Sequence, residues 1–205
     1  MIIKTIVFDL GGVYFQWSHH TWFHKAGKLL KIDGKLFREA YVAECSKAHK
    51  GHITAQEHLK RMSKFIEQET GKKIAPTKMY KTMFNFFKPM KKMWSLAKKL
   101  KKNGYTIALF SNHTSMIHDL NKKWKFFEHF HYPIVSVDVG MEKPEQKFYR
   151  YLIKQVKCKP KEIVFIDDIE VNVTAGRKVG IHCIQFTGNF EYLLKELKKL
   201  DVNIA

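Results

Sequence analysis

The stretch "TIVFDLGGVYFQW", residues 5–17, places a short strand-like run directly before a carboxylate, Asp9, and two glycines, Gly11 and Gly12. A short apolar run bounded by glycines predicts a buried strand. The charge at its end has two interpretations. Asp9 can cap a turn that the glycines permit, or it can react with a ligand that the bare backbone allows to approach. This stretch alone is compatible with both.

Similar apolar runs recur along the chain and predict further strands. Helical patterns separate them from the second run onward, as in "MKKMWSLAKKLKKNG" and "KPEQKFYRYLIKQVK". Strands that alternate with helices predict an α/β fold with a doubly wound, Rossmann-like parallel sheet. The expected strands are residues 2–8, 105–110, 134–137, 162–166 and 181–186.

Nearly a hundred residues with a different sequence pattern separate the first two expected strands. Residues 16–87 show helical periodicity and no convincing strand; Thr54 with Glu57 predicts a helix start, and Gly71 a helix end. The sequence therefore predicts a small all-helical cap at residues 16–87, inserted after the first strand of a core formed by residues 1–15 and 88–205.

Composition narrows the class of protein. Hydrophobic residues make up 45% of the 205 residues, which is enough for a packed core, and the formal net charge is +18. The excess lysines are scattered over expected helix faces, so we expect no specific nucleic-acid partner. Three widely spaced cysteines favour a reducing compartment, and no apolar run approaches the ~18 residues that span a bilayer. We expect a cytoplasmic protein without a membrane partner, as a monomer or homodimer.

Polar residues follow four of the expected strands, at the edge where ligands bind in open parallel sheets. They are Asp9, the pair Ser111 and Asn112, Lys143, and the pair Asp167 and Asp168. Each has a structural alternative: Ser111 and Asn112 are good helix N-caps, Lys143 can be an exposed turn residue, and one aspartate can cap the next helix. Together they suit one chemistry. Three converging carboxylates need a cation such as Mg²⁺, and a lysine and a serine hydroxyl can hold a phosphate while a carboxylate attacks its phosphorus.

The ordered segments "VFDLGGV", "LFSN", "GMEKPE" and "VFIDDIEVNVTAG" resemble the four motifs of the haloacid dehalogenase-like (HAD) hydrolase superfamily, from residue 6 to about 180. The position of the helical insert resembles subfamily I. The resemblance implies that Asp9 is the nucleophile and a Mg²⁺ ligand, with the backbone carbonyl of Gly11, Asp167 and Asp168 as further ligands. It also implies that Ser111 and Lys143 hold the phosphate, with Asn112 and Gly12 beside it, and that Asn172 orients the lysine.

One position departs from the phosphatase pattern of the superfamily. Gly11 stands where these enzymes usually carry a second aspartate, the general acid and base. The "DLGGV" form resembles a branch of sugar-phosphate phosphatases, and His113 is a candidate for the missing proton donor. We therefore expect a Mg²⁺-dependent phosphomonoester hydrolase that acts on a small phosphorylated metabolite, such as a sugar phosphate, through an aspartyl-phosphate. Two alternatives stay open: a haloacid dehalogenase, and a phosphometabolite-binding or regulatory protein with little activity.

Overall fold

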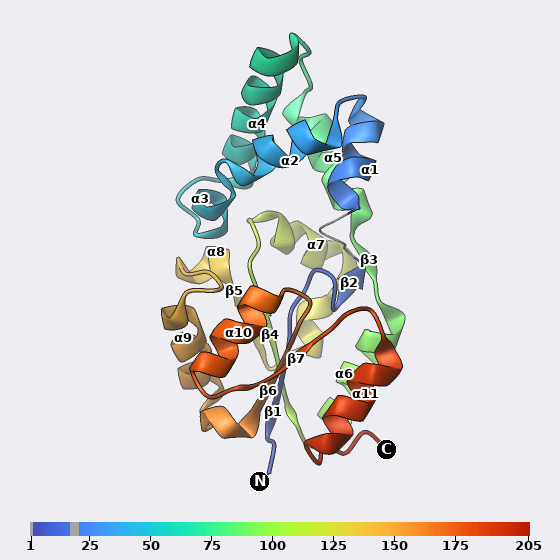
Figure 1. Ribbon diagram of the computed structural model, residues 1–205, viewed down its shortest axis with the longest axis vertical. Coiled ribbons are helices and arrows are strands. Elements are labelled where there is room, and N and C mark those ends of the chain that lie inside the picture. Colours follow the sequence, from blue (N-terminus) through green and yellow to red (C-terminus); the bar gives the residue numbers. More distant parts are fainter. Residues whose placement is uncertain (1, 17–20) are drawn as a thin grey trace.

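A computed structural model of the protein describes residues 2–16 and 21–205 (Figure 1). Residues 17–20, at the start of the expected cap, lie outside the described residues. Five parallel strands form one sheet in the order β5-β4-β1-β6-β7, which confirms the expected α/β class. Their bounds are β1 Thr5–Phe8, β4 Thr106–Ser111, β5 Tyr132–Val135, β6 Ile163–Asp167 and β7 His182–Gln185.

Strand β1 lies at the centre of the sheet, between β4 and β6, and both of its faces are covered. Ile6 and Phe8 join the apolar cluster that contains α6, α7 and α11, whereas Val7 joins the cluster that contains α9 and α10. Burial of both faces explains why the run is continuously apolar rather than alternating. The covering elements are α6 Lys91–Lys102, α7 Met116–Trp124, α9 Gln146–Val156, α10 Glu170–Lys178, α11 Phe190–Lys199, and the short 3₁₀ helices Phe126–His129 and Pro160–Glu162.

The third strand does not lie where the sequence predicts it. Strand β5 includes Pro133, and Ser136 begins a single helical turn, α8 Ser136–Val139, so the expected strand at 134–137 is wrong in its second half. Proline interrupts a strand pattern, but it is tolerated here because β5 is an edge strand. The turn of α8 closes with a hydrogen bond from the Gly140 N–H to the Ser136 carbonyl, and Gly140 has a φ of 69°.

Five helices follow β1 and gather at the end of the molecule opposite the chain termini (Figure 1). Thr54 accepts a hydrogen bond from the Glu57 N–H, and Gly71 ends the same helix with a φ of 69°, as the sequence predicts. The helices are α1 Trp22–Leu30, α2 Gly34–Val42, α3 Cys45–His49, α4 Ala55–Thr70 and α5 Pro76–Phe86. We refer to these helices as the helical cap.

Two short strands connect the helical cap to the sheet. Strand β2, Phe15–Gln16, pairs antiparallel with β3, Lys88–Pro89, so the two chain segments that enter and leave the cap run side by side. The Met90 N–H also donates to the Tyr14 carbonyl, as does the Trp94 indole N–H at 3.0 Å. These contacts tie the segment before α1 to the segment after α5.

Candidate active site

Asp9 and Asp167 lie side by side at the carboxyl ends of neighbouring strands. Phe8 of β1 is in register with Ile166 of β6, so the next residue of each segment leaves the sheet at the same edge. Lys143 reaches this edge from the loop before α9, and its Nζ donates to Asp9 Oδ1 and to Asp167 Oδ2, each at 2.6 Å. All three charged side chains are buried. The structure thus brings together three of the residues that the sequence singles out.

The carboxylate of Asp167 is surrounded by donors. Its Oδ1 accepts from the Ile169 N–H at 2.8 Å, and the Asn172 side-chain amide donates to Oδ1 at 3.3 Å and to Oδ2 at 3.1 Å. Asn172 lies in the first turn of α10, which directs it back toward the strand end. With Lys143 included, both oxygens of Asp167 are engaged. This arrangement makes Asp167 a partner that orients Lys143.

Asp168 stands in contrast to its neighbour. Its Oδ1 is buried and has no hydrogen-bond partner among the described residues. One oxygen from each of Asp9, Asp167 and Asp168 lies within 4.8 Å of the others. Burial, together with the negative charges of Asp9 and Asp167, raises the pKa of Asp168 to about 8. An unpartnered buried carboxylate beside two others is a site that a divalent cation would satisfy.

Lys143 lies among the three carboxyl groups of Asp9, Asp167 and Asp168. Burial raises the pKa of Asp9 to about 6, with Lys143 opposing the shift and Asp167 adding to it. Burial would lower the pKa of Lys143, but the carboxylates of Asp167 and Asp9 raise it above its ordinary value, so the lysine stays charged. One ammonium therefore faces three carboxyl groups, and the raised pKa values of Asp9 and Asp168 mean that further positive charge nearby would favour their ionised forms. Oxygen donors and a demand for positive charge both fit Mg²⁺.

Gly12 is required by the position of Asp168. Its φ is 80°, in the left-handed region, and a Cβ at this position would lie 2.3 Å from Asp168 Oδ2. Any side chain would therefore displace the carboxylate. The turn that begins at Gly12 is closed by a hydrogen bond from its N–H to the Phe15 carbonyl. The glycine noted in the sequence thus allows the backbone to pass close to the carboxylates.

Ser111 and Asn112 are not helix N-caps, because α7 begins later, at Met116. Ser111 ends β4, is buried and lines the cavity described below, and its Oγ makes a 3.5 Å contact with the Asn112 carbonyl. The Asn112 amide donates to the Lys143 carbonyl and accepts from the Lys143 N–H, both at 2.8 Å. The side chain of Asn112 therefore holds the backbone of Lys143 in place from the neighbouring strand end.

His113 has an environment that keeps its imidazole neutral. Burial lowers its pKa to about 4. Its Nδ1 lies 2.9 Å from the Thr114 carbonyl, so Nδ1 carries the proton and donates. In this tautomer Nε2 can accept a proton but cannot give one. The geometry therefore does not favour His113 as the general acid that Gly11 leaves unfilled.

A cavity of about 330 Å³ opens above these residues, between the sheet edge and the helical cap. Asp9, Gly11, Ser111 and Lys143 contribute to its floor. The cap contributes the walls, and these residues were not predicted as functional. They are Trp22, Phe23, Arg38, Tyr41, Val42, Cys45, His49 and Met83, with Phe87 from the segment that leaves the cap.

The signal for these wall residues is present in the sequence but ambiguous. Trp22 and Phe23 belong to the aromatic cluster at residues 14–23, and Met83 and Phe87 to the cluster "MFNFFKPM". Such clusters are typical of cap packing, and several of these side chains do pack in the core. Sequence alone does not show that the same packed surface also faces the nucleophile, because the chain must fold back across the sheet edge first.

Charged contacts hold the cap against the loop that carries Lys143. Lys50, just after α3, lies 2.5 Å from Glu145 and 3.5 Å from Glu142, and Ser46 donates a hydrogen bond to Glu142. On α5, the Tyr80 hydroxyl donates to Asp119 of the core at 2.5 Å. The cap therefore lies closed over the carboxylates. Closure of this kind excludes water from a reacting group.

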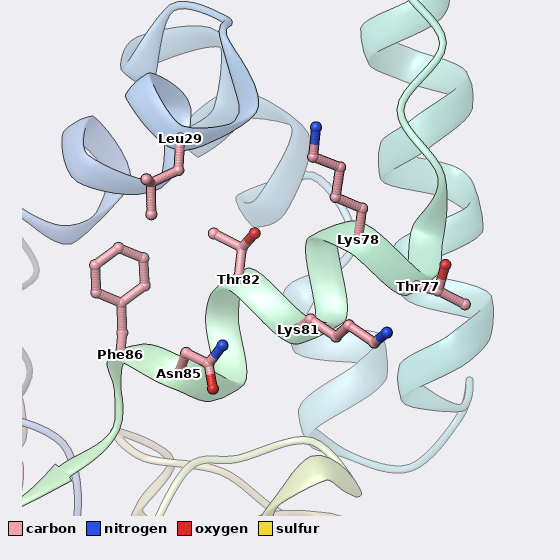
Figure 2. Close-up of a pocket in the computed structure, with 7 residues that line it drawn as sticks. All are labelled: Leu29, Thr77, Lys78, Lys81, Thr82, Asn85 and Phe86. Carbon is pink, nitrogen blue, oxygen red and sulfur yellow. The ribbon is translucent and has the colours of Figure 1, made fainter.

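A second cavity, of about 520 Å³, lies between α1 and α5 of the cap (Figure 2). Its walls share no residue with the cavity above Asp9. Figure 2 shows the side chains of Leu29 and Phe86 pointing toward each other, while Lys78 and Lys81 extend away from this pair. Its described lining contains no carboxylate, histidine or cysteine, so it offers no cluster of metal ligands.

The family follows from a comparison with known proteins. Residues 6–186 match the model of the haloacid dehalogenase-like hydrolase family, and the chain belongs to this family of hydrolases. It is 26% identical over 219 residues to the bifunctional epoxide hydrolase 2 of Mus musculus, covering 98% of this chain and 39% of that protein. It is 25% identical over 201 residues to the sesquiterpene phosphatase astK of Aspergillus oryzae, covering 96% of each.

Solved structures of the family have the same fold. The HAD family enzyme bt-2542 of Bacteroides thetaiotaomicron superposes with a TM-score of 0.78 at 22% identity, covering 95% of this chain and 99% of that one. A further structure of that enzyme contains magnesium and inorganic phosphate. The L-2-haloacid dehalogenase of Xanthobacter autotrophicus superposes with a TM-score of 0.68 at 15% identity, covering 98% and 85%.

The chain thus spans well under half the length of the mouse relative. Within residues 2–16 and 21–205, no helix has the length and apolar character needed to cross a membrane.

Proposed function

We propose that the protein is a Mg²⁺-dependent phosphomonoester hydrolase that acts on a small phosphorylated molecule through an aspartyl-phosphate on Asp9. One observation carries the proposal. At the floor of a capped cavity, Asp9 is buried and held by Lys143, while the neighbouring Asp168 has an unpartnered buried oxygen. A nucleophilic carboxylate, a fixed ammonium and carboxylate oxygens able to hold a cation are the groups that phosphoryl transfer needs.

The residues have separate roles in this proposal. Lys143 holds Oδ1 of Asp9, so Oδ2 would attack the phosphorus while the ammonium binds a phosphate oxygen. Asp9, Asp168 and the backbone carbonyl of Gly11 would hold Mg²⁺, which neutralises phosphate charge when bound. Asp167, expected from the sequence as a metal ligand, would act instead by positioning Lys143, because its oxygens are already occupied by donors. Ser111 would bind phosphate through its hydroxyl.

The bonds made and broken follow from these roles. Attack by Asp9 would form an O–P bond and break the P–O bond to the alcohol, which leaves with the bonding pair and takes a proton. Water would then attack the acyl phosphate, release inorganic phosphate and restore the carboxylate of Asp9. The closed cap would keep bulk water out during the first step.

Haloacid dehalogenation is the main alternative, since the fold of such an enzyme is similar. The cluster argues against it. Asp168 adds a third carboxyl group beside Asp9 and Asp167, and its buried Oδ1 has no hydrogen-bond partner among the described residues. That arrangement suits a cation and a phosphate. The magnesium and phosphate found with bt-2542 and the phosphatase activity named for astK support the proposal for this chain.

The proposed function predicts phosphate release that requires Mg²⁺. The protein is expected to hydrolyse p-nitrophenyl phosphate with Mg²⁺ and to lose this activity in a chelator, with recovery when Mg²⁺ is restored. Colorimetric measurement of p-nitrophenol and of inorganic phosphate tests both. Undiminished turnover in the chelator would contradict the proposal, and binding of phosphate esters without turnover would favour the regulatory alternative.

Gly11 predicts a strong dependence on the leaving group. With no carboxylate at this position and a neutral His113 that cannot donate, the departing oxygen must carry its negative charge unassisted. General acid catalysis contributes about 10²–10⁴-fold. The ratio of the rate on p-nitrophenyl phosphate to the rate on ethyl phosphate is therefore expected to exceed, by about this factor, the ratio for a phosphatase that has a general acid. Steady-state rates on the two esters measure the difference.

The variant Gly11→Asp tests the cause of this difference. If it folds and binds Mg²⁺, it is expected to narrow the difference by accelerating the ethyl ester. Equal rates on the two esters in the native protein, with chemistry rate-limiting, would show that another donor exists.

A further inference from the structure

The cavity above Asp9 has two chemically different ends. Its floor carries the charged groups of the sheet edge, whereas the wall supplied by the cap is largely apolar. Aromatic rings and aliphatic chains form this wall, and they come from α1, α2, α5 and the segment leaving the cap. They are Trp22, Phe23, Tyr41, Val42, Met83 and Phe87.

Several polar side chains around the cavity already have partners within the protein. The Asn112 side-chain amide hydrogen-bonds to the backbone of Lys143, and Nδ1 of His113 donates to the Thr114 carbonyl. His49 lies 3.4 Å from the Tyr41 hydroxyl and 3.5 Å from Glu142. A sugar would bring several hydroxyl groups into this space, and those that lie against the apolar cap wall would lose their water without gaining a matched partner.

Arg38 does not supply both the donors and the acceptors that the hydroxyl groups of a sugar would need. It lies on an exposed part of α2, and a guanidinium offers donors but no acceptor, so it cannot satisfy a hydroxyl group that must also donate. Cavities that select a polyhydroxylated ligand instead place paired donors and acceptors along their walls. The cap wall here offers hydrocarbon surface.

We propose that the substrate is the phosphate monoester of a small apolar alcohol, whose hydrocarbon part packs against the cap wall while its phosphate binds at Lys143 and Ser111. This inference rests on the proposed phosphatase function. The cavity volume of about 330 Å³ is at the lower end of the ~300–1,000 Å³ typical of small-molecule sites, so it restricts the alcohol to modest size.

A series of esters with equivalent leaving groups tests the inference. Ethyl, butyl and hexyl phosphate and glucose 6-phosphate are all esters of primary alcohols, so their intrinsic reactivity is similar. Burial of each added CH₂ is expected to raise kcat/KM by about threefold to fourfold, or roughly 100-fold from ethyl to hexyl phosphate. Glucose 6-phosphate is expected to fall at least about 10-fold below hexyl phosphate, since its hydroxyls lose their water.

A matched pair of variants locates the effect in the cap wall. Val42 lines the cavity yet is 43% exposed, so Val42→Thr keeps its shape, adds a hydroxyl and does not threaten folding. It is expected to lower kcat/KM for hexyl phosphate by about threefold to tenfold, because the bound chain covers the hydroxyl, and to affect ethyl phosphate less. Val171→Thr is the control, since Val171 is 56% exposed on α10 and is not among the described residues that line the cavity.

The outcomes separate the two proposals. Phosphate release from p-nitrophenyl phosphate, combined with no dependence on chain length or with a preference for glucose 6-phosphate, would overturn the inference and leave the phosphatase function in place. No Mg²⁺-dependent release from any of the five esters would overturn the phosphatase function and this inference with it. Equal effects of Val42→Thr and Val171→Thr on hexyl phosphate would exclude the cap wall as the binding surface.

Discussion

Asp9→Asn is expected to lower Mg²⁺-dependent phosphate release by at least about 10⁴-fold, because an amide is a poor nucleophile and a weaker metal ligand. The substitution preserves shape and removes one of three clustered carboxylates, and Lys143 keeps its 2.6 Å contact with Asp167. The variant should therefore remain folded. Phosphate release at saturating substrate, together with a thermal unfolding curve, measures both expectations.

A covalent readout makes this prediction independent of rate alone. Native protein mixed with substrate and quenched in acid should yield a peptide that contains Asp9 and carries a phosphoryl group, and Asp9→Asn should not. Asp138→Asn is the matched control, since Asp138 is an exposed carboxylate of α8 whose partner is His118 at 3.0 Å. Its activity should equal that of the native protein. Full activity in Asp9→Asn would show that another group attacks the phosphorus.

Lys143→Met is expected to lower the free energy of unfolding by about 3–5 kcal/mol in the absence of Mg²⁺. The variant leaves Asp9 and Asp167 buried without the ammonium that now lies 2.6 Å from each. Phosphate release should also fall sharply, because no ammonium would then hold Oδ1 of Asp9 and bind a phosphate oxygen. Chemical denaturation monitored by circular dichroism measures the loss of stability.

Added Mg²⁺ should stabilise Lys143→Met more than it stabilises the native protein, because a divalent cation replaces part of the missing positive charge. Thermal unfolding of both proteins with and without Mg²⁺ tests this. Lys147→Met serves as the control: Lys147 is 60% exposed and its ion pair among the described residues is the surface pair with Glu145, so its removal should cost no more than about 1 kcal/mol. Native stability in Lys143→Met without Mg²⁺ would mean that the ammonium does not compensate the carboxylates.

The strand ends of the core could be predicted because their determinants are local. A continuous apolar run such as 5–8 is compatible with a central strand, and parallel strands bring their carboxyl ends to one edge wherever they lie in the sequence. This is why Asp9 and Asp167 could be expected to meet, whereas Lys143 reaches the same edge from the loop before α9. The strand expected at 134–137 is wrong in its second half because Ser136 begins the helical turn α8, and β5 instead starts earlier and includes Pro133, which is tolerated because β5 lies at the sheet edge.

The sequence by itself thus determined which residue types gather at the sheet edge and that a helical segment follows the first strand. Only the tertiary structure decided which role each of these residues can take. Asp167 and Asp168 are adjacent in sequence, yet one is surrounded by donors and the other has an unpartnered oxygen, because the chain turns as it leaves β6. The cap wall, too, meets Asp9 only after the chain folds back. Which side chains meet across such distances depends on packing, and packing is a property of the whole fold.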